Sequence, residues 1–223
     1  DADKWLKTNV KERDSYFKSF AVHNLINEIK IDLELLNVKF NKFIFESDIV
    51  SSNIIDDLFK ILDNEKLLYL GELEKPKGED VEDWEPRKQL LFRSTKFNDD
   101  FDRPFKKANG DWTYFANDSA YHYDKFTRGY DNLINIWGAD HIGYVSRMKS
   151  IVDAISNKKN YLEICICQIV RLIKNGNLLK MSKREGNFIT LKEIHKTVGK
   201  DALRYFMISS KSETPMDFDM DKV

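Results

Sequence analysis

Residues 175–191 read NGNLLKMSKREGNFITL, and this stretch carries the strongest structural signals in the sequence. Asn175 and Gly176 lie between apolar residues, which favours a tight hairpin turn because both residue types tolerate the left-handed backbone that such turns need. Thr190 and Glu193 have the spacing of a capping box, which predicts that a helix begins at this point. The stretch therefore predicts a β-hairpin, a loop and a capped helix, in that order.

The loop between the hairpin and the helix concentrates positive charge. It begins with Lys180, Met181, Ser182, Lys183 and Arg184. Cationic side chains on such a loop can close over a polyphosphate and neutralise the charge that develops as pyrophosphate leaves. Short basic runs are also common on solvated surfaces, so the charge alone does not decide between the two uses.

The rest of the second half alternates between strand and helix patterns. Apolar runs predict strands at 133–137 and 161–173, and helical spacing predicts helices at 118–128, 142–155 and 202–208. Asn117 or Asp118 is the expected N-cap of the first of these helices, and Gly129 its expected stop. This alternation predicts an open α/β sheet.

The first half mixes the two patterns. Apolar spacing over residues 5–37 predicts two or three amphipathic helices, and Ser51 or Ser52 is expected to cap a helix that runs through Leu62. Short strands are expected at 40–45, 67–70, 89–93 and 112–115, with turns at 77–78 and 109–110.

Charge is almost balanced over the whole chain but not locally. The 223 residues include 36 Lys or Arg and 37 Asp or Glu, which disfavours a protein that coats DNA. Residues 46–85 hold 13 acidic residues against 4 lysines, whereas residues 171–200 hold 8 basic residues against 2 acidic ones. An anionic ligand would favour the second stretch.

Other features indicate a cytoplasmic protein with no membrane partner. The sequence has no apolar run of about 18 residues and no recognisable signal peptide. Cys165 and Cys167 have no second Cys or His pair at a spacing suited to zinc, so we expect reduced thiols and no protein-bound metal.

Several motifs together resemble one enzyme family. The string KMSKR at 180–184 resembles the second signature of class I aminoacyl-tRNA synthetases, and the whole run 175–191 resembles arginyl-tRNA synthetases of the bacterial type. So do WTYFA at 112–116, WGADHIGY at 137–144 and GKDALRYF at 199–206, which occur in the family's order. The resemblance extends over nearly the whole chain.

The resemblance implies an α/β fold: the second half of a Rossmann-like parallel sheet, with a mixed α+β connective insertion and the start of a C-terminal helical region. Residues 1–45 would end the first catalytic half and begin the insertion, which would occupy 46–111. Residues 112–189 would form the second catalytic half with the KMSKR loop, and 190–223 would be linking helices toward an anticodon-binding domain.

The activity implied is that of an arginine–tRNA ligase. Arginine would react with ATP to give arginyl adenylate and pyrophosphate, and the arginyl group would pass to tRNA(Arg). Mg²⁺ would arrive on the ATP phosphates. The resemblance further implies a cytoplasmic enzyme that is monomeric at full length and has neither DNA nor a membrane as a partner.

The resemblance also assigns the ATP-handling residues. Lys180 and Lys183 would stabilise the phosphates and the leaving pyrophosphate, while Ser182 and Arg184 would hold the loop or add a phosphate contact, and Met181 would lie beside the nucleotide. A second group, Gly138, Asp140 and His141, would receive the adenosine part of ATP. For Asp140, the alternative is a structural role as the N-cap of the helix that follows.

Three residues are implied for arginine itself: Tyr114, Asp118 and His122. A carboxylate can meet the planar guanidinium with paired hydrogen bonds, so Asp118 would recognise that group and Tyr114 would pack on it. From spacing alone, the alternatives are a helix cap for Asp118 and a core aromatic for Tyr114. His122 follows one turn later and is the weaker candidate.

One departure from the family limits the expected activity. The first class I signature, a His-x-Gly-His string, is absent from this sequence. We therefore expect a piece of a longer enzyme that lacks half of the ATP site and is inactive alone. The alternatives are a non-enzymatic synthetase-like module that binds RNA or protein, and a related nucleotidyltransferase.

Overall fold

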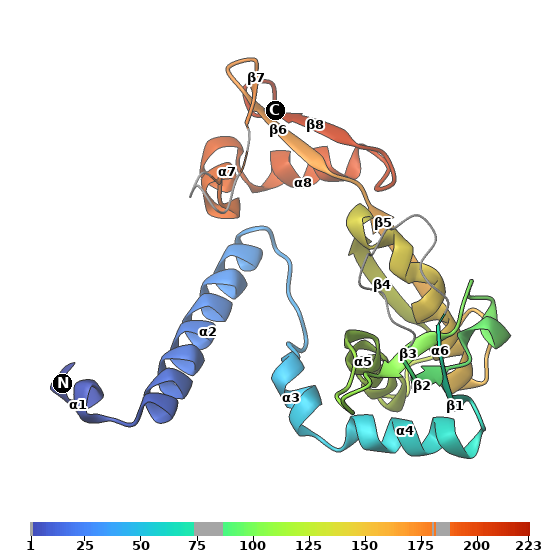
Figure 1. Cartoon of the computed structure of the whole chain (residues 1–223). Coiled ribbons are helices and arrows are strands. Elements are labelled where there is room, and N and C mark those ends of the chain that lie inside the picture. Colours follow the sequence, from blue (N-terminus) through green and yellow to red (C-terminus); the bar gives the residue numbers. More distant parts are fainter. Residues whose placement is uncertain (1, 74–86, 180, 182–187) are drawn as a thin grey trace. The chain divides into compact units, whose positions relative to one another are not determined.

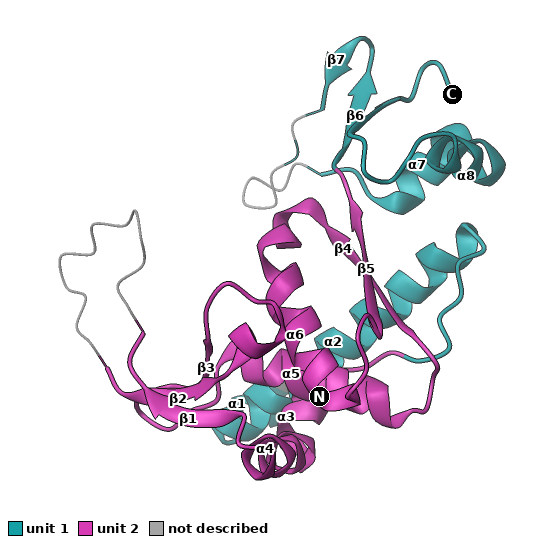
Figure 2. Cartoon of the chain, turned by 90° about the vertical axis from the view of Figure 1, so that its right-hand side faces the viewer, with its two compact units in different colours: residues 1–42, 169–223 teal, residues 43–168 magenta. Residues whose placement is uncertain are grey.

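The computed structural model describes residues 2–73, 87–179, 181 and 188–223. The chain divides into two compact units (Figure 2). Residues 43–168 form the continuous unit, whereas residues 1–42 and 169–223 together form the split unit. Among the helices in the described ranges, none has both the length and the apolar character needed to cross a membrane.

An antiparallel sheet forms one part of the continuous unit (Figure 1). Its strands, in spatial order, are β1 (Leu68–Gly71), β2 (Gln89–Phe92) and β3 (Arg103–Lys106), and β2 pairs with both neighbours. Two helices precede the sheet, α3 (Glu46–Ser51) and α4 (Ile54–Asn64). Helix α4 buries Ile55, Leu58 and Leu62, which recur at helical spacing and form one apolar face.

A parallel pair of strands forms the other part of this unit. Strand β4 (Leu133–Gly138) pairs with β5 (Leu162–Cys167) from Leu133 opposite Leu162 to Gly138 opposite Cys167. Helix α5 (Tyr114–Thr127) precedes β4, and the connection to β5 runs through the 3-10 helix η2 (Ala139–Tyr144) and α6 (Val145–Ser156). A helical connection between parallel strands is the βαβ arrangement expected of an α/β fold.

One core joins the two parts of the continuous unit. Phe92 of β2 and Phe105 of β3 are fully buried, and both contact the ring of Phe115 on α5, with centroids 6.1 and 6.2 Å away. A buried ion pair adds a polar link, because Asp99 accepts from Arg103 and also from the Ser146 hydroxyl of α6.

The split unit packs a small sheet against two helices. Strand β6 (Val170–Lys174) lies between the antiparallel β7 (Asn177–Leu178) and the parallel β8 (Met216–Asp219). The core side chains are Leu172, Leu203, Phe218 and Met220, and they come from the sheet, from α8 (Lys200–Ile208) and from the segment after β8. Helix α7 (Leu191–Val198) lies between the hairpin and α8 in the chain.

The N-terminal helices α1 (Ala2–Lys7) and α2 (Val10–Leu35) complete the split unit. At the end of α2, the guanidinium of Arg204 donates to the carbonyl of Leu36 over 2.7 Å, and Leu36 packs against the core of this unit. The two stretches of the split unit are thus joined near the end of α2.

The local signals around residues 175–191 are confirmed. Asn175 and Gly176 have φ angles of 51° and 70°, the left-handed values that the hairpin turn requires. Thr190 and Glu193 form both bonds of the capping box. The strand at 133–137, the helices near 142–155 and 202–208, and the expected α/β fold are confirmed as well.

Two expected strands are wrong. Residues 112–115 enter helix α5, whose N-cap is Thr113 and not Asn117 or Asp118; the Thr113 hydroxyl accepts from the Ala116 amide and satisfies a free donor of the first turn. Residues 40–45 form no strand either, and Ile44 from this stretch packs against the core of the continuous unit. The expected turn at 77–78 lies outside the described residues.

Candidate functional site

The carboxyl end of strand β4 carries three of the expected nucleotide-binding residues. Gly138 ends the strand, and Asp140 and His141 follow in η2. Both side chains are exposed, and Asp140 Oδ2 lies 3.5 Å from His141 Nε2. The cap positions of η2 and α6 belong to Gly138 and Tyr144, so Asp140 caps neither helix and its carboxylate is available to a ligand.

Gly138 leaves room for that carboxylate in its observed position. A Cβ atom at residue 138 would lie 2.5 Å from Asp140 Oδ1, closer than real contacts allow. The missing side chain therefore lets Asp140 fold back over the end of the strand. In α/β sheets, ligands bind at this edge, outside the carboxyl ends of parallel strands.

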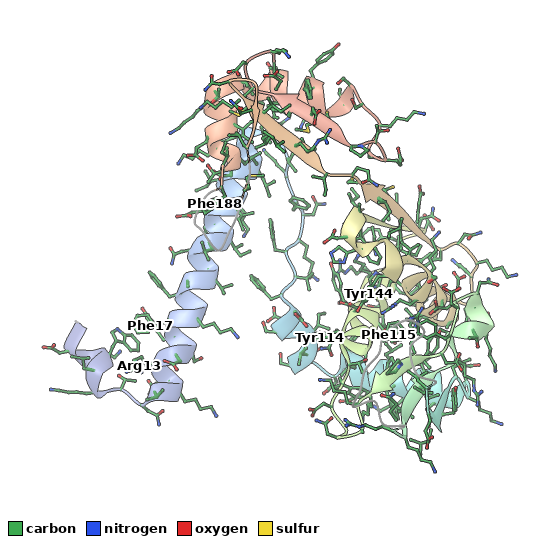
Figure 3. The ribbon with its side chains drawn as sticks, turned by 45° about the horizontal axis from the view of Figure 1, so that its top comes forward. Arg13, Phe17, Tyr114, Phe115, Tyr144 and Phe188 are labelled. Carbon is green, nitrogen blue, oxygen red and sulfur yellow. The ribbon has the colours of Figure 1, made fainter. Side chains whose placement is uncertain are left out.

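Tyr114 and Asp118 lie one turn apart at the start of α5. Tyr114 is the first helical residue and is 77% exposed, whereas its neighbour Phe115 is in the core (Figure 3). Tyr114 is therefore not a core aromatic. Since Thr113 caps the helix, the carboxylate of Asp118 is not used as a cap, and both alternatives drawn from spacing are excluded.

The carboxyl group of Asp118 lies where its charge is disfavoured. Partial burial raises its pKa, the nearby carboxylate of Glu46 raises the pKa further, and His141 lowers it. Within the described residues, no salt bridge pairs Asp118 with a Lys or Arg. A bound cation would supply the missing opposite charge. The electrostatic influence of His141 on the Asp118 carboxyl group indicates that the start of α5 lies near the residues that follow β4.

His122 lies beneath this surface and not on it. The residue is 4% exposed, and its Nδ1 and Nε2 lie 2.7 Å from the Asp118 carbonyl oxygen and 2.7 Å from Asn135 Nδ2. Burial lowers the pKa of His122 to about 4, so the ring is neutral at neutral pH. Both ring nitrogens are used inside the protein, unlike the exposed groups of Tyr114 and Asp118.

Acid is expected to weaken the continuous unit through His122. Because the folded-state pKa of about 4 lies below the ordinary value of 6.5, the unfolded chain takes up the proton first as pH falls. The stabilising contribution is complete above about pH 6.5 and is lost as pH falls toward 4, with a total on the order of 3 kcal/mol.

Urea unfolding at pH 7.5 and pH 4.5 measures this loss in the wild type and in His122→Gln, which cannot titrate in this range. The wild type should lose more unfolding free energy between the two pH values than the variant does. Equal losses in the two proteins would contradict the assignment of this pH dependence to His122.

The KMSKR string belongs to the split unit. Lys180, Ser182, Lys183 and Arg184 lie outside the described residues, while Met181 is described and about half exposed. Hairpin β6–β7 precedes the string and the capping box of α7 follows it. The residues expected to bind arginine and adenosine all lie in the continuous unit instead.

Asn135 is a residue that the sequence reasoning missed. It is 4% exposed on β4 and bridges His122 and Lys125, whose Nζ donates to Asn135 Oδ1 over 2.7 Å. One signal was present, since Asn135 is the only polar residue within the apolar run 133–137. Among the described residues, no group of three or more His, Cys, Asp or Glu is placed to hold a metal.

Residues 77–220 match the family model described as tRNA synthetases class I (I, L, M and V). The chain belongs to the class I tRNA synthetases. The match covers the parallel strands, η2 and the KMSKR string, so the family assignment rests on the same segments as the candidate site.

The curated relatives of this class I synthetase chain are arginine–tRNA ligases. The chain is 47% identical over 222 residues to the arginine–tRNA ligase of Orientia tsutsugamushi, a match that covers 99% of this chain and 38% of the relative. A solved arginyl-tRNA synthetase from Campylobacter jejuni matches with a TM-score of 0.78 and 31% identity, covering 96% of this chain and 43% of that chain. The resemblance to arginyl-tRNA synthetases is therefore confirmed.

A more distant structure shares the fold of this class I synthetase chain. The methionyl-tRNA synthetase of Mycobacterium tuberculosis, solved with methionyl-adenylate, matches with a TM-score of 0.59 and 13% identity, covering 86% of this chain and 52% of that chain. The chain spans about 38% of the length of the curated arginine–tRNA ligases that it matches.

Proposed function

We propose that this chain is part of an arginine–tRNA ligase and contributes the arginine site and one side of the ATP site. The observation that carries the proposal is the 47% identity to an arginine–tRNA ligase across 99% of the chain. The exposed pair Tyr114 and Asp118, with a carboxylate that lacks a cationic partner among the described residues, supports a guanidinium ligand.

In this proposal, the arginine carboxylate attacks the α-phosphate of ATP, and pyrophosphate leaves. Asp118 accepts paired hydrogen bonds from the guanidinium, and the exposed ring of Tyr114 packs beside that group. These contacts hold arginine in place, so that the reaction depends on positioning more than on covalent chemistry by the protein. The arginyl group then passes to a ribose hydroxyl of tRNA(Arg).

The nucleotide would lie at the carboxyl end of β4. Asp140 accepts from a ribose hydroxyl, Gly138 leaves room for close approach, and His141 borders the same site. Lys180, Lys183, Ser182, Arg184 and Met181 form the loop proposed to contact the phosphates. Mg²⁺ would arrive on those phosphates and neutralise part of their charge. We further propose that the full-length enzyme is a cytoplasmic monomer.

Exchange of pyrophosphate into ATP tests the proposal in the full-length enzyme, assayed with tRNA present and with a panel of amino acids. Exchange that requires arginine, together with arginyl-tRNA formation, is the expected result. Exchange without any amino acid would indicate a nucleotidyltransferase, and RNA binding with no exchange would indicate a non-enzymatic module; either result would overturn the proposal.

The isolated chain of residues 1–223 is expected to form no measurable arginyl-tRNA. Its sequence has no His-x-Gly-His string, so it lacks one side of the proposed ATP site. Thermal unfolding of the same sample serves as the control, because a cooperative transition would show that inactivity is not caused by misfolding. Arginyl-tRNA formation by this chain alone would contradict the division of the ATP site.

A further inference from the structure

A row of hydrogen bonds, centred on the buried residues His122 and Asn135, ties helix α5 to strand β4. Lys125 Nζ donates to Asn135 Oδ1, Asn135 Nδ2 donates to His122 Nε2, and His122 Nδ1 lies against the Asp118 carbonyl, with 2.7 Å at each step. All four residues belong to the continuous unit. The row ends at the backbone of Asp118, whose side chain carries the proposed arginine contact.

Which group donates and which accepts in each hydrogen bond of this row follows from the groups on either side. Because an ammonium group can only donate, Asn135 must turn its oxygen toward Lys125 and its amide nitrogen toward His122. Nε2 of His122 therefore accepts, and Nδ1 carries the proton that is donated to the Asp118 carbonyl. The imidazole is thereby held neutral, in one tautomer.

The ammonium group of Lys125 also has its hydrogen-bond partner in this row. Within the described part of the chain, its hydrogen-bond partner is the Asn135 oxygen and not a carboxylate. Its ammonium group also lies 4.7 Å from the ring centroid of Tyr121, and Asp124, the neighbouring acid, is paired with Arg128. The bond to Asn135 thus anchors the last turns of α5 to the sheet.

We propose that Asn135 and His122 are positioning residues for the arginine site, because they hold the turn of α5 that carries Asp118 against strand β4. This inference rests on the proposed function. It assigns His122 a role behind the site instead of a direct contact with arginine. Strand β4 ends at Gly138, so the row fixes the arginine-binding helix relative to the strand end proposed to receive the nucleotide.

A neutral His122 also suits a substrate whose guanidinium group is positively charged. An imidazolium at this position would place a second positive charge behind the proposed guanidinium site, where it would repel the ligand. The acceptor role that Asn135 imposes on Nε2 disfavours a second proton. Asn135 thereby keeps His122 uncharged, so that the ring adds no positive charge behind the proposed guanidinium site.

Steady-state kinetics of the full-length enzyme test this inference. Asn135→Leu removes both bonds of Asn135 at similar volume, and the KM for arginine should rise about tenfold while the KM for ATP changes less than twofold. Lys125→Met removes only the outer bond at a half-buried position, and a rise of about threefold is expected. This milder variant keeps the test decisive if Asn135→Leu does not fold.

Ser94→Ala is the matched control. Ser94 lies in the 3-10 helix η1 (Ser94–Phe97), is fully buried and donates to the Phe101 carbonyl over 2.7 Å, so its loss also removes one buried hydrogen bond. This control should lower the melting temperature without changing the KM for arginine. A general structural effect would instead leave both KM values unchanged in the Asn135 and Lys125 variants, which would overturn the inference.

Asp118→Ala, measured in the same series, separates the positioning role of Asn135 and His122 from the proposed arginine site itself. If Asp118→Ala raises the KM for arginine and the Asn135 and Lys125 variants do not, the positioning role is wrong and the arginine site stands. If Asp118→Ala has no effect, the proposed arginine site itself is wrong, and the positioning role falls with it.

Discussion

Replacing Lys183 by alanine in the full-length enzyme is expected to lower the rate of arginine activation by about 10²- to 10³-fold. The ammonium group is proposed to neutralise charge that develops on the departing pyrophosphate, so its contribution is larger in the transition state than with bound ATP. The kcat of pyrophosphate exchange should therefore fall more than the KM for ATP rises.

Folding should be nearly unaffected by this substitution. The described flanks of the string are secured by their own backbone bonds, in hairpin β6–β7 on one side and in the capping box of Thr190 and Glu193 on the other. We expect a stability change within about 0.5 kcal/mol, measured by thermal unfolding. Lys192→Ala, an exposed lysine on α7, is the control and should keep wild-type kinetics. Wild-type kinetics for Lys183→Ala would refute the role of the KMSKR loop.

Asp118→Asn should raise the KM for arginine about 100-fold, because a neutral amide replaces the carboxylate that is proposed to accept from the guanidinium. Charge-assisted bonds contribute about 1.5–3 kcal/mol each, and an amide nitrogen turned toward the ligand would add a repelled donor. Burial and Glu46 already raise the pKa of Asp118, so the free site gains from a bound cation. The KM for ATP should change little.

Asp124→Asn provides the control for this helix. Asp124 lies on the same helix, is partly buried and pairs with Arg128 away from the proposed site. The substitution removes a carboxylate of the same kind and should leave the KM for arginine within twofold of the wild type. If Asp118→Asn behaved like this control, Asp118 would not be the guanidinium acceptor.

Local signals predicted those parts of the fold that depend on neighbouring residues. The Asn175-Gly176 turn and the capping box at Thr190 were predictable because each is formed by residues within four positions of one another. Residues 112–115 misled the prediction, since their aromatic and β-branched side chains favour a strand. The Thr113 hydroxyl overrides that preference by capping α5, and its tertiary bond to the Pro104 carbonyl could not be predicted from neighbouring residues.

Some residues of the candidate site could be predicted from the sequence, and others could not. Resemblance indicated Tyr114 and Asp118, and the structure places both side chains at the surface. The buried ring of His122 has its Nε2 partner, Asn135, on another element, so no local pattern indicates this contact. The row from Lys125 to Asp118 exists only once α5 packs on β4.

The division of the chain has a consequence for the order in which it folds during synthesis. Residues 43–168 form a unit without interruption, so this unit can acquire its core as soon as it leaves the ribosome. The split unit is completed later, because Leu36 meets Arg204 only after α8 has been translated, and β6 pairs with β8 only after the last strand has been translated. The β7–β6–β8 sheet is therefore completed last, when β8 pairs with β6 at the cost of closing a long intervening segment, although its β6–β7 hairpin is local. A ribosome stalled once β5 has left the exit tunnel would display the folded surface proposed to bind arginine before the sheet that flanks the KMSKR string is complete.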